Sequence, residues 1–303
     1  MFSIDLFYNY LEFEKRYSPH TVEAYRSDIT QFQDFLQNIY SILDFKDVKP
    51  IHLRSWIVQL HEQKIGNRSI NRKISALKTF FQFLRKRHGI DQNPLRKIIN
   101  PKMEKRLPVT IRKEHLNALL SVTYDNTASE DSNLLVYQNN LILEVLYSCG
   151  LRRSELINLK MADIDFSRQV IRVEGKGKKE RQIPLSGTLL KKINAFMIIR
   201  NQYFLDQEKQ DHGHLFTTEK CEILYPKYVY NLVRLKLGEV STVERKSPHI
   251  LRHSFATHLS DAGADLNAVK TLLGHSSLAA TQVYMHNTIE KLKKIYEQAH
   301  PKS

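Results

Sequence analysis

The sequence predicts a mainly α-helical protein with one small β-sheet, organised as two domains. Apolar residues recur at helical spacing through most of the chain. Residues 168–185 differ, because β-branched residues there flank two glycines, a pattern typical of a β-hairpin. With 303 residues, of which 42% are hydrophobic and 10% aromatic, the chain is long enough to bury the cores of two ordinary domains.

The first hundred residues are predicted to be helical throughout. A helix over 18–37 begins with Ser18 as its N-cap and Pro19 at the first helical position. A shorter helix is expected around Leu53–Leu60, and Gly66-Asn67 interrupts the chain after it. The next helix spans 68–87, and its apolar stripe consists of Ile70, Ile74, Leu77, Phe81 and Leu84.

The remaining surface of the helix over 68–87 is strongly basic. Arg68, Arg72 and Ser75 fall on one side of it, and Lys73 adds a further cation. A helix that enters the major groove of DNA needs such a side, but a run of charges is more commonly a solvated face. The spacing leaves both interpretations open, and we take Arg68, Arg72 and Lys73 as candidate DNA contacts.

Residues 91–108 are predicted to link the domains. Proline restricts its own backbone and that of the preceding residue, so no helix can run through this segment. Its basic side chains suit a linker that lies along a phosphate backbone. We expect a helical domain over 1–100, a basic linker over 101–108 and a second domain over 109–303. The prolines and basic residues of the segment are Pro94, Pro101, Pro108, Lys97, Lys102, Lys105 and Arg106.

The second domain is predicted to mix helices with the hairpin. We expect a helix over 112–121, a polar loop over 123–133 and an apolar helix over 134–148 that ends at Gly150. The hairpin over 168–185 has a basic tip, on which Lys178 and Arg181 are candidate DNA contacts. The rest of the domain is predicted to be mostly helical.

The chain carries a large positive excess, with 46 Lys and Arg against 32 Asp and Glu and a net charge of +14. Such an excess favours a polyanionic partner, and nucleic acid fits best, because neutralising phosphates releases counterions. The two cysteines, Cys149 and Cys221, are too few for a disulfide framework or a zinc ribbon. We find no secretory signal and no apolar run of membrane-spanning length, so we expect a cytoplasmic protein without a membrane partner.

Two pairs of polar residues suggest anion sites at helix starts. Ser247-Pro248 opens a helix on which His249 and Arg252 are three residues apart, and therefore on one face. Arg152 directly follows Gly150-Leu151 at the start of another helix, where Glu155 can bind its guanidinium. A surface cap explains the second pair equally well. A zinc site at His249 is disfavoured, because the residue after it is not the glutamate that zinc proteases need.

Three further residues complete the candidate set. Lys176 lies between two glycines at the hairpin tip, where a flexible basic turn is the simpler interpretation. His275 follows Gly274 at a helix junction, and Tyr284 comes nine residues later. Taken singly, such a histidine is usually structural, and such a tyrosine usually packs in a core.

The candidate residues taken together, in their order along the chain, favour a shared catalytic function over separate structural roles. Five separate motifs resemble those of the tyrosine recombinase or phage-integrase family, and most closely those of the bacterial Xer recombinases. They are Gly-Leu-Arg-x-Ser-Glu-Leu at 150–156, Gly-Lys-Gly-x-Lys-x-Arg at 175–181, His-x-Leu-Arg-His-x-Phe-Ala-Thr-His at 249–258, Leu-Leu-Gly-His at 272–275 and Thr-x-x-Tyr at 281–284. The amino-terminal stretch 16–25 matches as well, so the resemblance covers essentially the whole chain. Arg153, where family members commonly have a small apolar residue, and the long polar stretch 123–133 depart from the pattern.

The resemblance implies a fold and an activity. The fold is a helical SAM-like core-binding domain followed by an α-rich catalytic domain, which together form a C-shaped clamp around DNA. The activity is site-specific recombination, in which DNA is cut and rejoined through a 3′-phosphotyrosyl intermediate and a Holliday junction. Neither a cofactor nor a metal is implied. The implied catalytic residues are Arg152, Lys176, His249, Arg252, His275 and the nucleophile Tyr284, with Glu155 supporting them.

The resemblance also implies partners. Recombinases of this family act as tetramers on two DNA core sites, alone or with a paired recombinase. An FtsK-type translocase can direct them during the resolution of chromosome or plasmid dimers at cell division. The predicted last helix, Ile289–Ala299, has an apolar stripe that fits either a neighbouring subunit or its own domain.

Other functions remain to be weighed. A type IB topoisomerase uses a similar cationic set with a tyrosine, but the helical first domain and the Xer-type motifs argue against it. A mobile-element integrase would share all the motifs. A DNA-binding accessory protein with an inactive site is disfavoured, since all six candidate catalytic residues are present.

Overall fold

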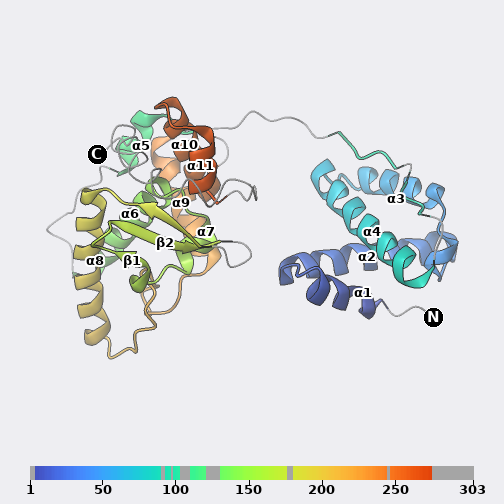
Figure 1. Ribbon diagram of the computed structural model, residues 1–303, viewed down its shortest axis with the longest axis horizontal. Coiled ribbons are helices and arrows are strands. Elements are labelled where there is room, and N and C mark those ends of the chain that lie inside the picture. The colour runs from blue at the N-terminus through green and yellow to red at the C-terminus, as the bar shows by residue number, and fades with distance from the viewer. Residues whose placement is uncertain are drawn as a thin grey trace. The chain divides into compact units, whose positions relative to one another are not determined.

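The computed structural model describes residues 4–89, 93–96, 98–102, 110–120, 130–175, 180–243 and 246–274, with the backbone alone at 130–133. The chain divides into two compact units, Met1–Arg106 and Leu107–Ser303. The division lies inside the predicted linker 101–108. The helices up to α4 belong to the first unit, and α5 to α11 with the sheet belong to the second (Figure 1).

The first unit is built from helices. Their bounds are α1 Asp5–Asn9, a π-helical turn Tyr10–Glu14, α2 Pro19–Tyr40, a 3-10 turn Phe45–Asp47, α3 Pro50–Glu62 and α4 Asn67–His88. The three helices predicted from the apolar spacing are thereby confirmed. The Ser18 hydroxyl accepts a hydrogen bond from the backbone N–H of Thr21, which makes Ser18 the N-cap of α2 as predicted.

Aromatic side chains fill the core of the first unit. Phe32 packs against Trp56 with ring centroids 4.9 Å apart, and Phe7 meets Phe80 edge-on at 5.0 Å. All four rings are at most 2% exposed. The core therefore joins α1, α2, α3 and α4 into one body.

A buried ion pair in the first unit involves Lys73, one of the candidate DNA contacts. The ammonium of Lys73 binds Asp28 at 3.0 Å and also the side-chain oxygen of Gln31. Lys73 is only 5% exposed and Asp28 is fully buried. In this structure the charge of Lys73, together with that of Arg72, neutralises a buried carboxylate, since an unpaired charge there would be costly. The role of Lys73 in DNA binding stays a prediction.

The other two cations of α4 remain accessible. Arg68 is exposed, and Arg72 keeps 44% of its side chain exposed although its guanidinium also reaches Asp28 and the carbonyl of Ala24. Ser75 is exposed on the same face. The predicted polar face of α4 thus exists, while its role in DNA binding stays a prediction.

The second unit surrounds a three-stranded antiparallel sheet. The strands are β1 Ile164–Asp165, β2 Val170–Glu174 and β3 Glu180–Pro184, in the order β1-β2-β3. The hairpin predicted over 168–185 is confirmed, with Ile171 paired to Ile183 and Val173 paired to Arg181. The short strand β1 was not predicted. The hairpin tip, with Lys176 and Lys178, lies outside the described residues.

The helices of the second unit are α5 Lys113–Leu120, α6 Glu130–Ser148, α7 Arg153–Ile157, α8 Gly187–Asp206, α9 Pro226–Val240, α10 Pro248–Asp261 and α11 Leu266–Leu272, with a 3-10 turn at Met161–Asp163. The helix α6 begins four residues earlier than predicted, so part of the polar stretch 123–133 is helical. Residues 141–148 of α6 and the following Cys149 are all buried, and α6 packs against both α8 and α10. It is the central helix of this unit (Figure 1).

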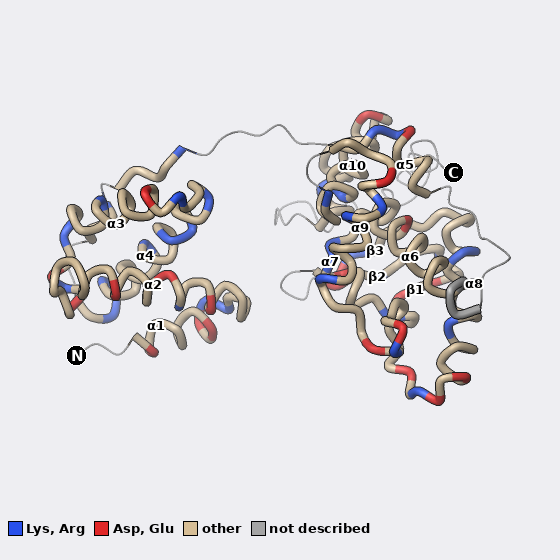
Figure 2. Tube along the Cα trace, turned by 180° about the vertical axis from the view of Figure 1, so that it is seen from behind, with Lys and Arg blue, Asp and Glu red and all other residues tan. Residues whose placement is uncertain are grey.

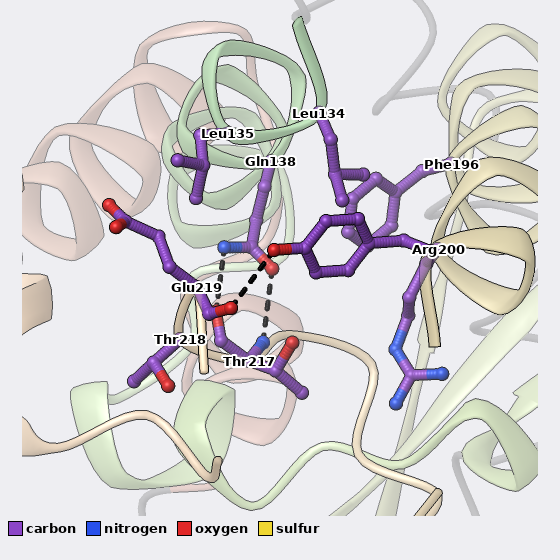
Figure 3. Close-up of a pocket in the computed structure, with 9 residues that line it drawn as sticks. Leu134, Leu135, Gln138, Phe196, Arg200, Thr217, Thr218 and Glu219 are labelled. Atoms are coloured by element: carbon purple, nitrogen blue, oxygen red, sulfur yellow. Dashed lines mark hydrogen bonds between the residues drawn. The ribbon is translucent and has the colours of Figure 1, made fainter. Parts of the chain in front are cut away.

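A small pocket lies between α6, α8 and residues 217–219, and hydrogen bonds join these three segments around it. Gln138 donates to the carbonyl of Thr217 at 2.8 Å and accepts from its N–H at 3.0 Å, and Tyr203 donates to the carbonyl of Glu219 (Figure 3). The cavity of about 10 Å³ has room for no more than one water molecule. No candidate site residue lines it.

Within the part of the chain that the structure describes, none of the helices combines the length and the apolarity that crossing a bilayer requires.

Candidate active site

Arg152 lies at the turn between α6 and α7. Gly150 ends α6 with a positive φ of 56°, which reverses the chain direction, and Arg152 then occupies the N-cap position of α7 in an extended conformation. The backbone N–H of Arg152 donates to Glu155 at 2.7 Å. Lys and Arg positions are visible where α7 begins (Figure 2). The predicted arrangement at this helix start is therefore present.

Glu155 is shared by three arginines. Its carboxylate accepts from Arg152 at 2.6 Å and from both terminal nitrogens of Arg181 at 2.8 Å, and it lies 3.7 Å from Arg252. Only 4% of its side chain is exposed. We call these four residues the arginine cluster. Three guanidinium groups against one carboxylate leave an excess of positive charge, which suits a phosphate group.

The pKa of Glu155 reflects this position. Burial acts to raise it, but the hydrogen bonds from Arg181 and from the backbone of Arg152 outweigh burial and lower the pKa to about 2 from the ordinary 4.5. The carboxylate is therefore ionised at any physiological pH.

We expect the free energy of unfolding to fall as the pH drops from about 4.5 toward about 2. In this range the Glu155 carboxylate takes up a proton in the unfolded chain but stays ionised in the folded one, so protonation favours unfolding. The contribution is fully present above the unfolded pKa, and the difference between the two values corresponds to roughly 3 kcal/mol. Urea unfolding across this range should show a shallower pH dependence in Glu155→Gln than in the wild type. Glu174→Gln, which removes an exposed carboxylate of β2, is the control. An unchanged slope in Glu155→Gln would contradict the assignment.

Arg252 projects from α10, one turn after His249. Its guanidinium donates to the carbonyl of Gly150 at 2.6 Å and to that of Leu273. The side chain is 8% exposed, and burial, aided by the charge of Arg152, lowers its pKa to about 10, so it stays protonated at neutral pH. Arg152 is the more accessible cation, with 31% of its side chain exposed.

His249 lies at the exposed start of α10. Partial desolvation of its ring, followed by the nearby charges of His253 and Arg252, lowers the pKa of His249 below the ordinary 6.5. The arginines Arg152 and Arg153 act in the same direction. At neutral pH the ring is therefore mostly neutral and able to accept a proton.

Arg181, a candidate DNA contact, is bonded inside the protein in this structure. It was expected to contact DNA from the hairpin, but its side chain is 9% exposed and all of its nitrogens donate inside the protein. Besides the two bonds to Glu155, Nε donates to the carbonyl of Leu272 at 2.7 Å. The composition of the hairpin tip suggested a solvated cation, and the partners that bury Arg181 come from other parts of the chain.

The structure brings together Arg152, Glu155 and Arg252 of the predicted set, and places His249 within electrostatic reach of Arg152 and Arg252. Lys176, Lys178, His275 and Tyr284 lie outside the described residues, as does the predicted last helix 289–299. Gly274, the last described residue, is next to His275, and its carbonyl is 3.4 Å from Arg152. In the described ranges, no three potential ligands among His, Cys, Asp and Glu gather in a way that could hold a metal ion.

Two family models match the chain. The model described as "Phage integrase family" covers residues 110–291. The model described as "Phage integrase, N-terminal SAM-like domain" covers residues 4–88.

Relatives match over nearly the full length. A tyrosine recombinase XerC of Chlorobaculum parvum is 35% identical over an alignment of 315 positions, which covers 98% of this chain and 94% of that protein. A tyrosine recombinase XerC of Bacillus subtilis is 33% identical over 300 residues, which is 99% of this chain and 96% of that protein.

Solved structures share the fold. The XerH site-specific recombinase bound to a palindromic difH substrate, in a post-cleavage complex, aligns with a TM-score of 0.69 at 21% identity, over 90% of this chain and 78% of that one. The Tn1549 transposon integrase in complex with transposon right end DNA aligns with a TM-score of 0.67 at 18% identity, over 91% and 92% of the two chains. Both are likenesses of fold.

Proposed function

Because this chain belongs to the phage integrase family and is a Xer-type site-specific tyrosine recombinase, we propose that it cuts and rejoins DNA through a 3′-phosphotyrosyl link to Tyr284. The arginine cluster is the observation that supports this proposal most directly. Arg152 at the start of α7 and Arg252 of α10 converge on one buried carboxylate, and Arg252 stays protonated at neutral pH. Such cations stabilise the negative charge that builds up on the non-bridging oxygens of a phosphate under attack.

The first step is a transesterification. The phenolic oxygen of Tyr284 attacks the scissile phosphorus, and the phosphorus–5′-oxygen bond breaks. In this proposal His249, whose lowered pKa favours the neutral ring at physiological pH, takes up the phenolic proton, directly or through a relay. Lys176 donates a proton to the leaving 5′-oxygen, and His275 donates a hydrogen bond to a non-bridging oxygen. In the second step another 5′-hydroxyl attacks the phosphotyrosyl link, so the energy of the bond is conserved and the reaction needs no ATP or metal.

A nicked suicide substrate tests the function. A break placed next to the scissile bond lets the short 5′-hydroxyl fragment diffuse away and prevents rejoining. We expect a covalent protein–DNA adduct that forms in the presence of EDTA, and proteolysis should assign the nucleotide to the peptide that contains Tyr284. A chain that forms no adduct on any Xer-like core site would be a DNA-binding accessory protein instead.

Lys176→Ala should slow cleavage by roughly 10²- to 10⁴-fold, the range typical of a lost general acid. The loss should be far smaller on DNA with a 5′-thiol leaving group, because a thiolate departs without a proton. Single-turnover rates on both substrates measure this difference.

Lys178→Ala, a change in the same hairpin, is the matched control. As a proposed DNA contact, Lys178 should affect both substrates equally. Equal slowing by Lys176→Ala on the two substrates would remove Lys176 from the acid role.

We further assign the first unit to recognition of the core site and the second to catalysis, in a clamp around DNA. Arg68 and Arg72, both accessible on α4, are the proposed contacts in the first unit. The partner of the chain is DNA. The proposed assembly is a tetramer on two core sites, with four copies of this chain or with a paired recombinase, acting in the cytoplasm.

The proposed purpose is resolution of chromosome or plasmid dimers at cell division, directed by an FtsK-type translocase. Mapping the bound DNA across the genome tests this purpose. One peak near the replication terminus is expected. Peaks at the ends of a mobile element would identify an integrase instead.

A further inference from the structure

Arg181 connects three segments that are far apart in the sequence. It lies on β3, directly after the hairpin tip, and it bonds to Glu155 of α7 and to the carbonyl of Leu272 at the end of α11. β3 and α11 are also in contact as elements. The one side chain therefore joins the hairpin, the Arg152 helix and the segment that leads into His275.

The geometry uses the guanidinium in a way that lysine cannot reproduce. Two parallel N–H groups engage both oxygens of Glu155 at 2.8 Å, and Nε points to a third acceptor at 2.7 Å. The fork fixes the plane of the carboxylate, whereas an ammonium is a point charge with no such plane. Glu155 also accepts a hydrogen bond from Arg152, so its orientation helps to fix the guanidinium of Arg152. Arg252, which is bonded to the carbonyls of Gly150 and Leu273, lies 3.7 Å from the same carboxylate and interacts with its charge.

The backbone opposite Arg181 is shaped to admit it. Gly274 adopts a positive φ of 64°, and a Cβ at this position would lie 3.3 Å from both Cδ and Nη1 of Arg181. A residue with a side chain would therefore press on the guanidinium and strain the backbone. The close approach of Gly274 and the low exposure of Arg181 restrict the access of a phosphate to this cation.

From this geometry we propose that Arg181 is a positioning residue of the recombinase: it orients Glu155 and thereby holds Arg152, beside Arg252, where the scissile phosphate is bound. It does not itself touch DNA. This inference rests on the proposed function. It predicts that loss of Arg181 weakens catalysis and leaves DNA affinity unchanged, whereas loss of a DNA contact would do the reverse.

The test compares Arg181→Gln and Arg181→Lys with the wild type on a suicide substrate and in DNA binding at several salt concentrations. Arg181→Gln should cleave roughly 10- to 100-fold more slowly at saturating DNA, as is usual for residues that orient charged site groups. Its Kd and the salt dependence of its Kd should match those of the wild type, since the number of neutralised phosphates is the same. Arg181→Lys should fold, as thermal melting can verify, and still cleave well below the wild-type rate.

A methylphosphonate at the scissile position separates positioning from a general structural defect. This linkage lacks the charge that Arg152 and Arg252 stabilise, so the losses in Arg181→Gln and Arg152→Gln should both shrink on it. Arg172→Gln is the matched control. Arg172 is exposed on the neighbouring strand β2 and donates to the carbonyl of Ala162. The variant should cleave within about twofold of the wild-type rate.

Three outcomes would overturn the assignment of Arg181: full activity in Arg181→Lys, a weaker Kd with a reduced salt dependence in Arg181→Gln, or an undiminished loss in Arg181→Gln on the methylphosphonate. Absence of an adduct in the wild type would instead refute the proposed function. The two failures are therefore distinguishable.

Discussion

Tyr284→Phe is expected to abolish the covalent adduct with DNA, lowering its rate of formation by at least about 10⁴-fold, while DNA affinity stays within about twofold of the wild type. The substitution removes a single oxygen, the one that would form the new bond to phosphorus. The ring and its packing are kept, so folding and binding should be unaffected. Adduct formation on the nicked substrate and DNA binding, measured on the same preparation, check both parts.

The control for this prediction is Tyr296→Phe, which removes the hydroxyl of another tyrosine in the carboxyl-terminal segment. It should form the adduct at the wild-type rate. An adduct in Tyr284→Phe, or its loss in Tyr296→Phe, would contradict the assignment of the nucleophile.

Gly150→Ala is expected to destabilise the second unit by about 2–5 kcal/mol and to impair cleavage. Two effects combine here. A Cβ would lie 2.5 Å from Cδ1 of Phe255 and 3.0 Å from Leu273, which forces the packing to shift. The positive φ of 56° adds backbone strain of about 1–2 kcal/mol.

The expected fall in Tm is roughly 5–15 °C, since a domain of this size loses about 2–4 °C per kcal/mol. Cleavage should suffer as well, because the carbonyl of Gly150 accepts from Arg252, and Phe255 lies on the same helix as Arg252.

Gly263→Ala is the control for the steric part of this prediction. Gly263 also has a positive φ, of 89°, but nothing lies within 4 Å of a Cβ there. The free energy of unfolding of Gly263→Ala should fall only by the contribution of backbone strain, and its cleavage rate should be normal. Equal destabilisation in the two variants would show that contact with Phe255 and Leu273 plays no part.

The sequence alone determined the family and several of the elements, and it supplied the candidate residues for the chemistry. Helical spacing and caps predicted α2, α4 and α10, and the turn glycines predicted the β2–β3 hairpin, because these signals depend on residues only a few positions apart. The pairing of Arg152 with Glu155 followed from a spacing of three residues, a distance over which helical geometry is certain. The family resemblance is confirmed by the matching models and relatives.

The boundaries of elements were less well determined. The polar residues at 130–133 suggested a loop but belong to α6, since the packing of its later turns stabilises the whole helix. The strand β1 has two residues, too few to show any alternation of apolar and polar side chains.

The tertiary structure decided which cations face solvent and which are internal. Lys73 and Arg181 lie in basic stretches that suggested DNA contacts, yet each is buried against a carboxylate. Asp28 is 45 residues from Lys73, and Glu155 is 26 residues from Arg181. A charge pattern read along the chain contains no information about a partner that distant. Only folding, which brings the carboxylate and the cation together out of water, determines that each of these charges lies against a carboxylate of its own chain.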